Sequence, residues 1–279
     1  MKLLTLNAHA WHEENQLDKI RELAAFIDQH SFDLIAMQEV NQPAAQPPLS
    51  VEKLTHYFAA DYDAVIRRDN YAHILVSHLQ TVYYWTWVPV HAASRGRLDE
   101  GLAILSRTPL TEAILGHVST QHIYEHYKTR KVLAVQTEYQ GQPLWLADGH
   151  FGWWNDEVEP FRPQWDRAEE LLAPCLDDQV FFLGDFNNVA EIRGEGYDYM
   201  MKHIWHDTYT LAEEKDGGHT VVKSIAGWEG NERPLRIDYI YSNRPMRVQR
   251  SQVALDGTNG AVVSDHFGVM VELDCTNAE

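Results

Sequence analysis

Short apolar runs, each bounded by polar or glycine residues, recur along the whole of this 279-residue chain. Most are about four to six residues long, a length that suits a buried β-strand better than a helix of several turns. The runs are residues 3–6, 34–37, 103–105, 132–135, 144–147, 180–183, 237–241 and 269–273. This pattern predicts a fold dominated by β-sheets.

Two segments carry helical periodicity instead. Residues 17–27 and 158–172 place apolar side chains at every third or fourth position. Asn15 stands where a helix cap is expected, and Pro160 and Pro174 stand near the start and the end of the second segment. Many strands with few amphipathic helices predict an α/β chain, in which two packed sheets carry helices outside them. No linker or repeat interrupts the pattern, so residues 1–279 are expected to form one domain.

The charge balance bears on partners. Lys and Arg number 23 and Asp and Glu number 41, which gives a formal net charge of −18. Nucleic-acid affinity depends largely on Lys and Arg that neutralise phosphates, and anionic membranes attract basic segments. We therefore expect neither nucleic acid nor a membrane as a partner, although an acidic chain can still hold a small basic site.

Several features favour a cytoplasmic protein. Asn7 and His9 interrupt the N-terminal apolar run before a signal peptide could form. No stretch approaches the ~20 apolar residues that span a bilayer. Cys175 and Cys275 lie far apart, in no spacing typical of a disulfide framework or a zinc finger.

Polar side chains stand where the expected strands begin or end, and there a rigid sheet holds functional groups with little positional slack. Asp238 lies inside an otherwise apolar run and needs a partner, for which a histidine is a natural candidate. The other polar residues in such positions are Asn7, Gln38, Glu39, His150, Asp185, Asn187, Asp265 and His266.

Five short segments resemble, in order, the signature blocks of the endonuclease/exonuclease/phosphatase superfamily, which has the deoxyribonuclease I-like fold. They are Leu4-Thr5-Leu6-Asn7, Ile35-Ala36-Met37-Gln38-Glu39-Val40, Leu183-Gly184-Asp185-Phe186-Asn187, Ile237-Asp238-Tyr239-Ile240 and Ser264-Asp265-His266. Residues 101–107 also resemble an internal strand of those proteins. One block alone is weak, but five in order are specific. The resemblance implies a two-sheet β-sandwich flanked by helices, a four-layer α/β/β/α arrangement.

The resemblance also implies a metal-dependent phosphoesterase. Glu39 would be the main metal carboxylate, with Asn7 and Asp265 completing the ligand set. Carboxylate and amide ligands without a thiolate select a hard ion, so Mg²⁺ is expected, with Mn²⁺ as the alternative.

The remaining roles are implied in the same way. Asp185 would position or deprotonate the attacking water, and Asn187 would orient water or a phosphate oxygen. Asp238 would pair with His266, which makes that imidazolium a phosphate clamp more than a base. His150 would contact the phosphate, and Arg130 matches the phosphate-binding arginine of the family.

Each of these residues also has a structural interpretation when taken alone. Asp185 and Asn187 are common turn formers, and a lone Glu39 after a strand is usually a solvated acid. His9 stands where many related nucleases carry an acid or Asn beside the metal, and its role is left open. Asp148-Gly149-His150 departs from the Thr-His pair that is commoner at this place in the superfamily. The pair Asp99-Glu100 is interpreted as an exposed acidic loop, with a contribution to the site as the alternative.

The segment after His150 bears on the substrate. Trp153 and Trp154, followed by Asn155, Asp156 and Glu157, suit a carbohydrate, because indole faces cover sugar C–H groups and the polar groups bind hydroxyls. The alternative is that both tryptophans pack in the core at a helix entry. The acids there would repel a polyanionic strand and tolerate a neutral sugar with one phosphate.

A narrower resemblance concerns the substrate. Leu6 to Trp11, Glu14-Asn15, and Gly152-Trp153-Trp154 through Trp165-Asp166 look most like the bacterial maltose 6′-phosphate phosphatases. This resemblance implies hydrolysis of maltose 6′-phosphate to maltose and phosphate. A Mg²⁺-dependent endonuclease or exonuclease, a sphingomyelinase-like phosphodiesterase and a non-catalytic binding module remain as alternatives.

Overall fold

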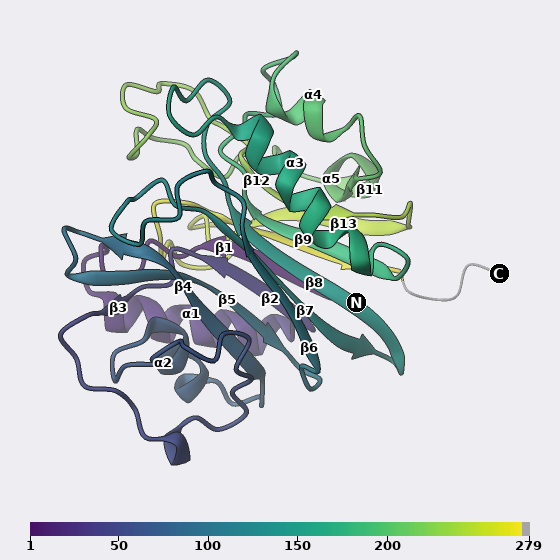
Figure 1. The fold of residues 1–279 in the computed structure, drawn as a ribbon. Coiled ribbons are helices and arrows are strands. Elements are labelled where there is room, and N and C mark those ends of the chain that lie inside the picture. The colour runs from purple at the N-terminus through teal and green to yellow at the C-terminus, as the bar shows by residue number, and fades with distance from the viewer. Residues whose placement is uncertain (275–279) are drawn as a thin grey trace.

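The computed structural model describes residues 1–274, and two mixed β-sheets pack face to face at its centre (Figure 1). Helices cover the outer face of each sheet, so the molecule has four layers. The two-sheet α/β/β/α sandwich that the sequence predicts is confirmed.

The first sheet brings the N-terminal strand to its centre. β1 and β2 are parallel, and Asn7 pairs with Gln38 in their register, so both strands end at the same edge. In spatial order the strands are β11 (Ala212–Lys215), β13 (Val248–Ala254), β14 (Gly268–Leu273), β1 (Lys2–Asn7), β2 (Leu34–Gln38), β5 (Leu98–Ser106) and β3 (Gln42–Pro43), with β4 (Tyr84–Ala93) also paired to β5.

The second sheet brings three of the predicted polar residues to one edge. β8 and β9 are parallel and place His150 opposite Asp185, and the antiparallel β12 places Asp238 opposite the same Asp185. In spatial order the strands are β10 (His206–Asp207), β12 (Asp238–Ser242), β9 (Gln179–Asp185), β8 (Gln142–His150), β7 (Lys131–Tyr139) and β6 (Glu112–His117).

Helices of unequal length cover the sheets. α1 (Gln16–His30) and α2 (Tyr71–His78) pack on the first sheet, and α3 (Phe161–Leu172) packs on the second. The remaining helical turns are η1 (Val51–Lys53), η2 (Ala173–Cys175), α4 (Gly196–Met200) and α5 (Thr208–Leu211).

Apolar side chains fill all three spaces between the four layers. The inner faces of the two sheets meet through residues such as Leu3, Ile104, Leu146 and Leu183, all of which are buried. Because the central strands are covered on both faces, their sequences are continuous apolar runs with no alternation. Each such side chain contributes about 1.5–3 kcal/mol when fully buried.

The two long helices begin differently from the expectation. Asn15 occupies the N-cap position of α1 as predicted, but it has a left-handed backbone (φ 54°) and its side chain makes no capping hydrogen bond. Its carbonyl instead accepts the N–H groups of Asp18 and Lys19. Leu17, which the periodicity places on the apolar face, is 46% exposed. Gln16 is buried in its place because its side-chain oxygen accepts the N–H of Trp11 at 2.6 Å.

α3 begins at Phe161, three residues later than its apolar periodicity predicts, and Pro160 occupies its N-cap position. The Asp156 carboxylate accepts the backbone N–H groups of Val158 and Glu159, both at 2.8 Å. These bonds hold the segment in a turn, so Val158 is exposed and lies outside the helix. Pro174 lies in η2, directly after α3 ends, as the sequence predicts.

Two remaining sequence expectations concern cysteines and membranes. Cys175 is buried and free, whereas Cys275 lies outside the described residues. Within residues 1–274, none of the helices is both long enough and apolar enough to traverse a bilayer.

Candidate functional site

Strand ends from both sheets bring Asn7, Glu39 and Asp185 into contact. The Asn7 amide nitrogen donates to Glu39 Oε1 at 3.0 Å and to Asp185 Oδ2 at 3.1 Å. Asn7 ends β1, Glu39 follows β2, and Asp185 ends β9 of the other sheet. The amide therefore joins the two sheets at the point where their polar side chains converge.

Backbone geometry at this edge is specialised. Glu39 and Asn187 have left-handed backbones, with φ of 50° and 49°, a conformation that clusters at functional sites. Gly184, at φ 151°, precedes Asp185, and a Cβ there would lie 2.0 Å from the carbonyl oxygen of Gly149. Only glycine therefore allows β8 and β9 to approach closely beside His150 and Asp185.

His266 lies between two carboxylates of the second sheet. Its Nδ1 is 3.0 Å from Asp238 Oδ2, which is the pairing that the sequence predicts, and its Nε2 is 3.8 Å from Asp185 Oδ2. Burial alone would lower the pKa of His266, but Asp238 and Asp185 raise it to about 10. The ring is therefore an imidazolium at neutral pH. Ser264 holds its loop by donating to the Asn7 carbonyl at 2.7 Å.

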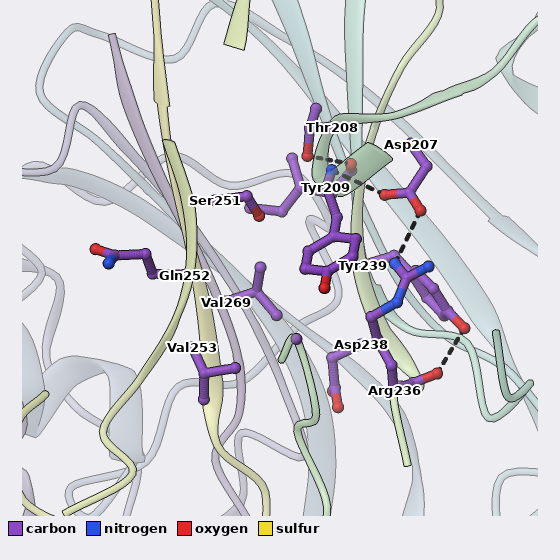
Figure 2. A pocket seen from close by; sticks show the side chains of 12 residues that line it. Asp207, Thr208, Tyr209, Arg236, Asp238, Tyr239, Ser251, Gln252, Val253 and Val269 are labelled. Atoms are coloured by element: carbon purple, nitrogen blue, oxygen red, sulfur yellow. Dashed lines mark hydrogen bonds and ion pairs between the residues drawn. The ribbon is translucent and has the colours of Figure 1, made fainter. Parts of the chain in front are cut away.

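The chain around Asp238 is held rigidly. Next to it in sequence and space, Arg236 donates to Asp207 at 2.8 Å and stacks on Tyr209 and Tyr239, with centroid distances of 4.6 and 4.8 Å (Figure 2). The adjoining cavity is about 10 Å³, far too small for a substrate. These contacts support the start of β12, which carries Asp238.

Burial and neighbouring acids outweigh the effect of nearby histidines on the pKa values of the two acids at the centre. Burial, followed by repulsion from Glu100, raises the pKa of Glu39 to about 7. Burial, followed by repulsion from Asp238, raises the pKa of Asp185 to about 7. Among the described residues, the buried Oδ1 of Asp238 also has no hydrogen-bond partner. An oxygen-rich cluster with surplus negative charge fits a hard divalent cation.

The expected metal ligands are arranged unevenly around Glu39. The Asn7 amide oxygen, the atom that would bind a cation, accepts the N–H of His9 at 3.2 Å. Asp265 is near enough to raise the pKa of Glu39, yet its own contact is with His9.

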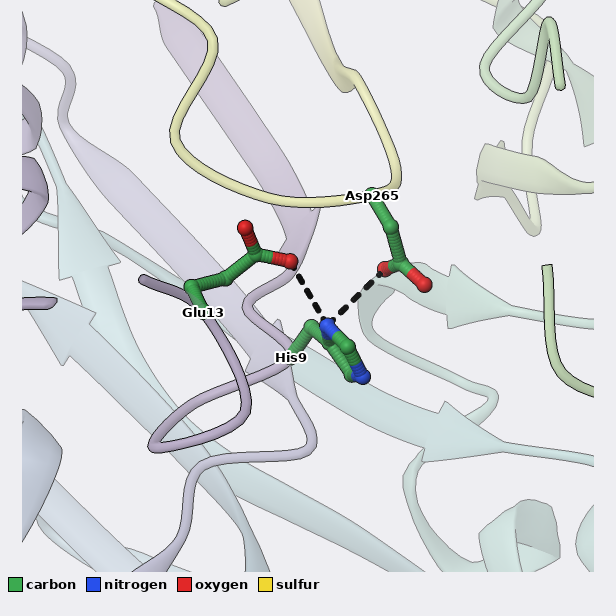
Figure 3. A group of neighbouring side chains, drawn as sticks. All are labelled: His9, Glu13 and Asp265. Carbon is green, nitrogen blue, oxygen red and sulfur yellow. Dashed lines mark hydrogen bonds and ion pairs between the residues drawn. The ribbon is translucent and has the colours of Figure 1, made fainter. Parts of the chain in front are cut away.

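His9, whose role the sequence left open, belongs to a second group with Glu13 and Asp265 (Figure 3). Its Nδ1 is 2.7 Å from Glu13 Oε1 and 3.6 Å from Asp265 Oδ1. Lys19 Nζ lies 2.5 Å from the other oxygen of Glu13, so this group carries its own balancing cation.

The interpretation of Asp99 and Glu100 as an exposed acidic loop is wrong. Both lie in β5, and the Glu100 side chain is only 12% exposed. The hairpin register places Glu100 opposite His91 of β4, and their side chains form an ion pair at 3.0 Å. The acid pair directly before an apolar run was the available signal, but nothing local marked His91.

Asp148, the departure noted before His150, lies between the sheets and not in the site. It is fully buried, and Gln38 donates to its Oδ1 at 2.6 Å. Burial raises its pKa well above the ordinary range. Through its bond with Gln38, Asp148 links β8 to β2.

A cavity of about 900 Å³ opens at the cluster. One side is lined by Glu39, Glu100, Arg130, His150, Asp185, Asn187 and His266, and the other walls by residues 91–96, Glu125, Tyr127, Trp153, Ala226, Gly227 and Glu229. Arg130 is buried, and its Nε has no partner within the described part of the chain.

The two predicted sugar-binding tryptophans separate in the structure. Trp153 lines the cavity. Trp154 does not, because its ring packs between Phe161 and Tyr199, at centroid distances of 6.4 and 5.8 Å. Trp154 therefore has the core-packing place that the sequence left as the alternative.

Residues 10–266 match the sequence profile of the Endonuclease/Exonuclease/phosphatase family. The chain belongs to this family. A family member from Leptotrichia buccalis is 32% identical, with a TM-score of 0.85 over 98% of this chain and 99% of that one. No curated protein matches the chain.

More distant members of the endonuclease/exonuclease/phosphatase family share the fold. A mannosyl-6-phosphatase from Bacteroides thetaiotaomicron is 16% identical, with a TM-score of 0.66 over 98% of this chain and 99% of that one. D. rerio TDP2, in complex with a single-strand DNA product, is also 16% identical, with a TM-score of 0.64 over 97% of each chain. Enzymes of the family are hydrolases that generally use divalent metals, and the acidic and histidine groups described above are of that kind.

The pKa shifts predict how the stability of the metal-free protein, measured in the presence of a chelator, depends on pH. The folded-state pKa values of Glu39 and Asp185, about 7, exceed their ordinary values of 4.5 and 3.8. A raised pKa contributes stability at low pH that is lost as pH rises through the folded value. For the same reason, the contribution of His266 to stability is lost as pH rises toward 10. We therefore expect the melting temperature in EDTA to fall from pH 5 to pH 8.

Melting curves with and without Mg²⁺ at each pH check this expectation. Mg²⁺ should raise the melting temperature more at pH 8, where the carboxylates are ionised. Glu39→Gln should flatten the pH dependence in EDTA because one of the three groups is removed. A melting temperature that rises between pH 5 and pH 8 in EDTA would contradict the assignment.

Proposed function

We propose that the protein is a Mg²⁺-dependent phosphomonoesterase that acts on a small sugar phosphate, with maltose 6′-phosphate as the first candidate. The observation that carries the proposal is the single 900 Å³ cavity. It joins the carboxylate and histidine cluster to walls that carry an indole, a phenol and several carboxylates. A volume of this size is within the range of about 300–1,000 Å³ that small-molecule sites occupy.

Glu39 is the central ligand in this proposal, with Asp265 and the Asn7 amide beside it. Mg²⁺ or Mn²⁺ bound there would neutralise charge on the phosphate oxygens. The fit rests on the oxygen donor set, and the repulsion from Glu100 that adds to burial in raising the pKa of Glu39 supports a cation there.

The other residues divide the work of hydrolysis. His266, held as an imidazolium by Asp238, and Arg130 bind nonbridging phosphate oxygens by charge-assisted hydrogen bonds. With a pKa of about 10, His266 is too rarely deprotonated at neutral pH to serve as the base. Asp185, with a pKa of about 7, is better matched to accept a proton from water at that pH.

The far walls favour a sugar. The faces of Trp153 and Tyr127 cover C–H surfaces, and the carboxylates of Glu125 and Glu229 accept hydrogen bonds from hydroxyls. The same carboxylates, on a chain of net charge −18, oppose a nucleic-acid strand. The fold shared with a mannosyl-6-phosphatase supports this substrate class, and the one shared with TDP2 bound to DNA makes a nuclease the second candidate.

One substrate panel tests the proposal. Maltose 6′-phosphate, glucose 6-phosphate, abasic DNA and sphingomyelin vesicles are each incubated with and without Mg²⁺, and products are measured. We expect Mg²⁺-dependent phosphate release from the sugar phosphates, fastest with maltose 6′-phosphate. Cleavage of DNA that falls steeply with salt would support the nuclease instead, and turnover of sphingomyelin the phosphodiesterase. No turnover of any substrate would leave a binding module.

The cavity wall that carries Trp153 gives a separate prediction. Trp153→Ala should raise KM for maltose 6′-phosphate about tenfold, equivalent to ~1.4 kcal/mol, because a stacking face is lost. KM for p-nitrophenyl phosphate, which lacks the sugar, should change much less. Trp154→Ala is the matched control, since its ring contacts Phe161 and Tyr199 away from the cavity. It should lower the melting temperature and leave KM unchanged; an equal KM effect for both variants would contradict the assignment.

A further inference from the structure

Trp228 is a tryptophan that the sequence analysis did not single out. It lies in the segment between β11 and β12 and packs against the buried residues Val221, Ile225 and Leu235. Its indole Nε1–H donates to Asn187 Oδ1 at 2.8 Å. A residue from a separate loop is thus bonded directly to a residue of the candidate active site.

This bond settles the orientation of the Asn187 amide. An indole N–H can only donate, so the amide atom that it meets must be the oxygen. The opposite amide atom lies 3.0 Å from the Phe151 carbonyl, which can only accept, so that atom must be the nitrogen. Both contacts give the same orientation of Asn187.

The amide orientation in turn settles the proton position on His150. The Asn187 nitrogen also lies 3.2 Å from His150 Nε2. Because that amide nitrogen donates, and because the other polar neighbour, Asp185 Oδ2, is farther from Nε2 at 3.6 Å, Nε2 presents its lone pair and the ring proton of the neutral form is on Nδ1. Nδ1 lies on the side of Glu39, 4.0 Å from its Oε1.

The segment that carries Trp228 approaches the cavity wall closely at the neighbouring Gly227. Gly227 has φ 80°, and a Cβ there would lie 2.1 Å from the ring of Trp153 in the cavity wall. The segment that holds Asn187 therefore also abuts the wall proposed to bind the sugar.

We propose that Trp228 is a positioning residue. Through Asn187 it holds His150 in the Nδ1–H tautomer, so that this N–H faces a phosphate oxygen bound beside Glu39. Asn187 then acts by orienting His150, since its two amide hydrogens are directed to Phe151 and His150. The effect on catalysis rests on the proposed phosphatase function, whereas the tautomer does not.

Trp228→Phe tests the proposal, because it keeps an aromatic ring in the apolar cluster and removes only the indole N–H. In protein labelled with ¹⁵N-histidine, long-range ¹H–¹⁵N spectra report the tautomer of each ring. The His150 signals are found among the 15 histidines by comparison with His150→Gln. We expect wild-type His150 as Nδ1–H, and partly averaged nitrogen shifts in Trp228→Phe, because the amide orientation then depends on the bond to the Phe151 carbonyl alone.

The kinetic test compares the change in kcat with the change in KM for maltose 6′-phosphate. If His150 loses its fixed orientation, kcat should fall about 10- to 100-fold, with a smaller change in KM. Removal of a hydrogen-bond partner behind a functional side chain commonly has an effect of this size. Trp145→Phe is the matched control, because its indole N–H donates to Asp178 at 3.3 Å, at the opposite end of β8. It should leave both the His150 tautomer and kcat unchanged.

Asn187→Asp provides a second variant that does not disturb the Trp228 loop. A carboxylate accepts from Trp228 but cannot donate to His150, so Nε2 should become protonated. Wild-type His150 protonated on Nε2, or an unchanged tautomer in both variants, would overturn the proposal, and so would an unchanged kcat in Trp228→Phe. If no sugar phosphate is a substrate, the spectra still decide the tautomer, so the two proposals fail separately.

Discussion

Asp185→Asn is expected to lower kcat for phosphate release by about 10²–10⁴-fold, the usual contribution of a positioned general base. The amide keeps the size of the side chain and loses the ability to accept a proton from water. His266 retains its 3.0 Å partner Asp238, so the phosphate clamp should survive and KM should change less than kcat. Steady-state kinetics at saturating Mg²⁺ measure the effect.

Stability separates this loss from unfolding. Since burial raises the pKa of Asp185, its ionised form destabilises the folded protein at neutral pH. An asparagine carries no such charge, so the variant should melt at or above the wild-type temperature in EDTA. Asp178→Asn, placed just before the other end of β9, is the matched control and should retain activity. Near-wild-type turnover by Asp185→Asn would refute its assignment as the base.

Glu39→Gln is expected to have the other large effect, because it removes the charged oxygen at the centre of the proposed ligand set. At a fixed Mg²⁺ concentration, kcat/KM should fall by about 10²–10³-fold, comparable to the loss of one strong electrostatic group in a buried site. Titration of Mg²⁺ should also show a weaker apparent affinity, which calorimetry measures without any substrate.

The control for Glu39→Gln makes the same chemical change elsewhere. Glu138 is exposed on β7, so Glu138→Gln should leave Mg²⁺ affinity and turnover unchanged. Unaltered Mg²⁺ binding by Glu39→Gln would contradict the central place of Glu39. Full activity in EDTA would contradict metal dependence altogether.

The strand pattern was the most predictable part of the fold. Strands such as β1 and β9 are buried on both faces, so their sequences are short apolar runs that no amphipathic helix would show. Helix starts were less predictable. Asn15 stands at the N-cap of α1 without a side-chain bond, and the bond from Trp11 to Gln16 buries Gln16 in place of Leu17 in the first turn. Such a bond depends on a chain fold that local propensity does not encode.

The candidate site was predictable only where its residues follow strands. Asn7, Asp185 and His266 could be named because they stand at strand ends within recognisable blocks. His91 and Trp228 could not, since each acquires its place through a partner on a different element, Glu100 by hairpin register and Asn187 by a loop contact. Trp153 and Trp154 are adjacent in sequence, and only packing distinguishes the cavity wall from the core.

By itself, the sequence indicated two packed sheets through its apolar runs, and the family and the chemical type of the central cluster through the resemblance of its five signature blocks. These properties depend on local burial patterns and on residue identity, which a sequence carries directly. The tertiary structure alone decided the raised pKa values of Glu39 and Asp185, the pairing of Glu100 with His91 and the tautomer of His150. Those depend on distances between separate elements of the fold, because electrostatic and hydrogen-bond energies change over a few ångströms.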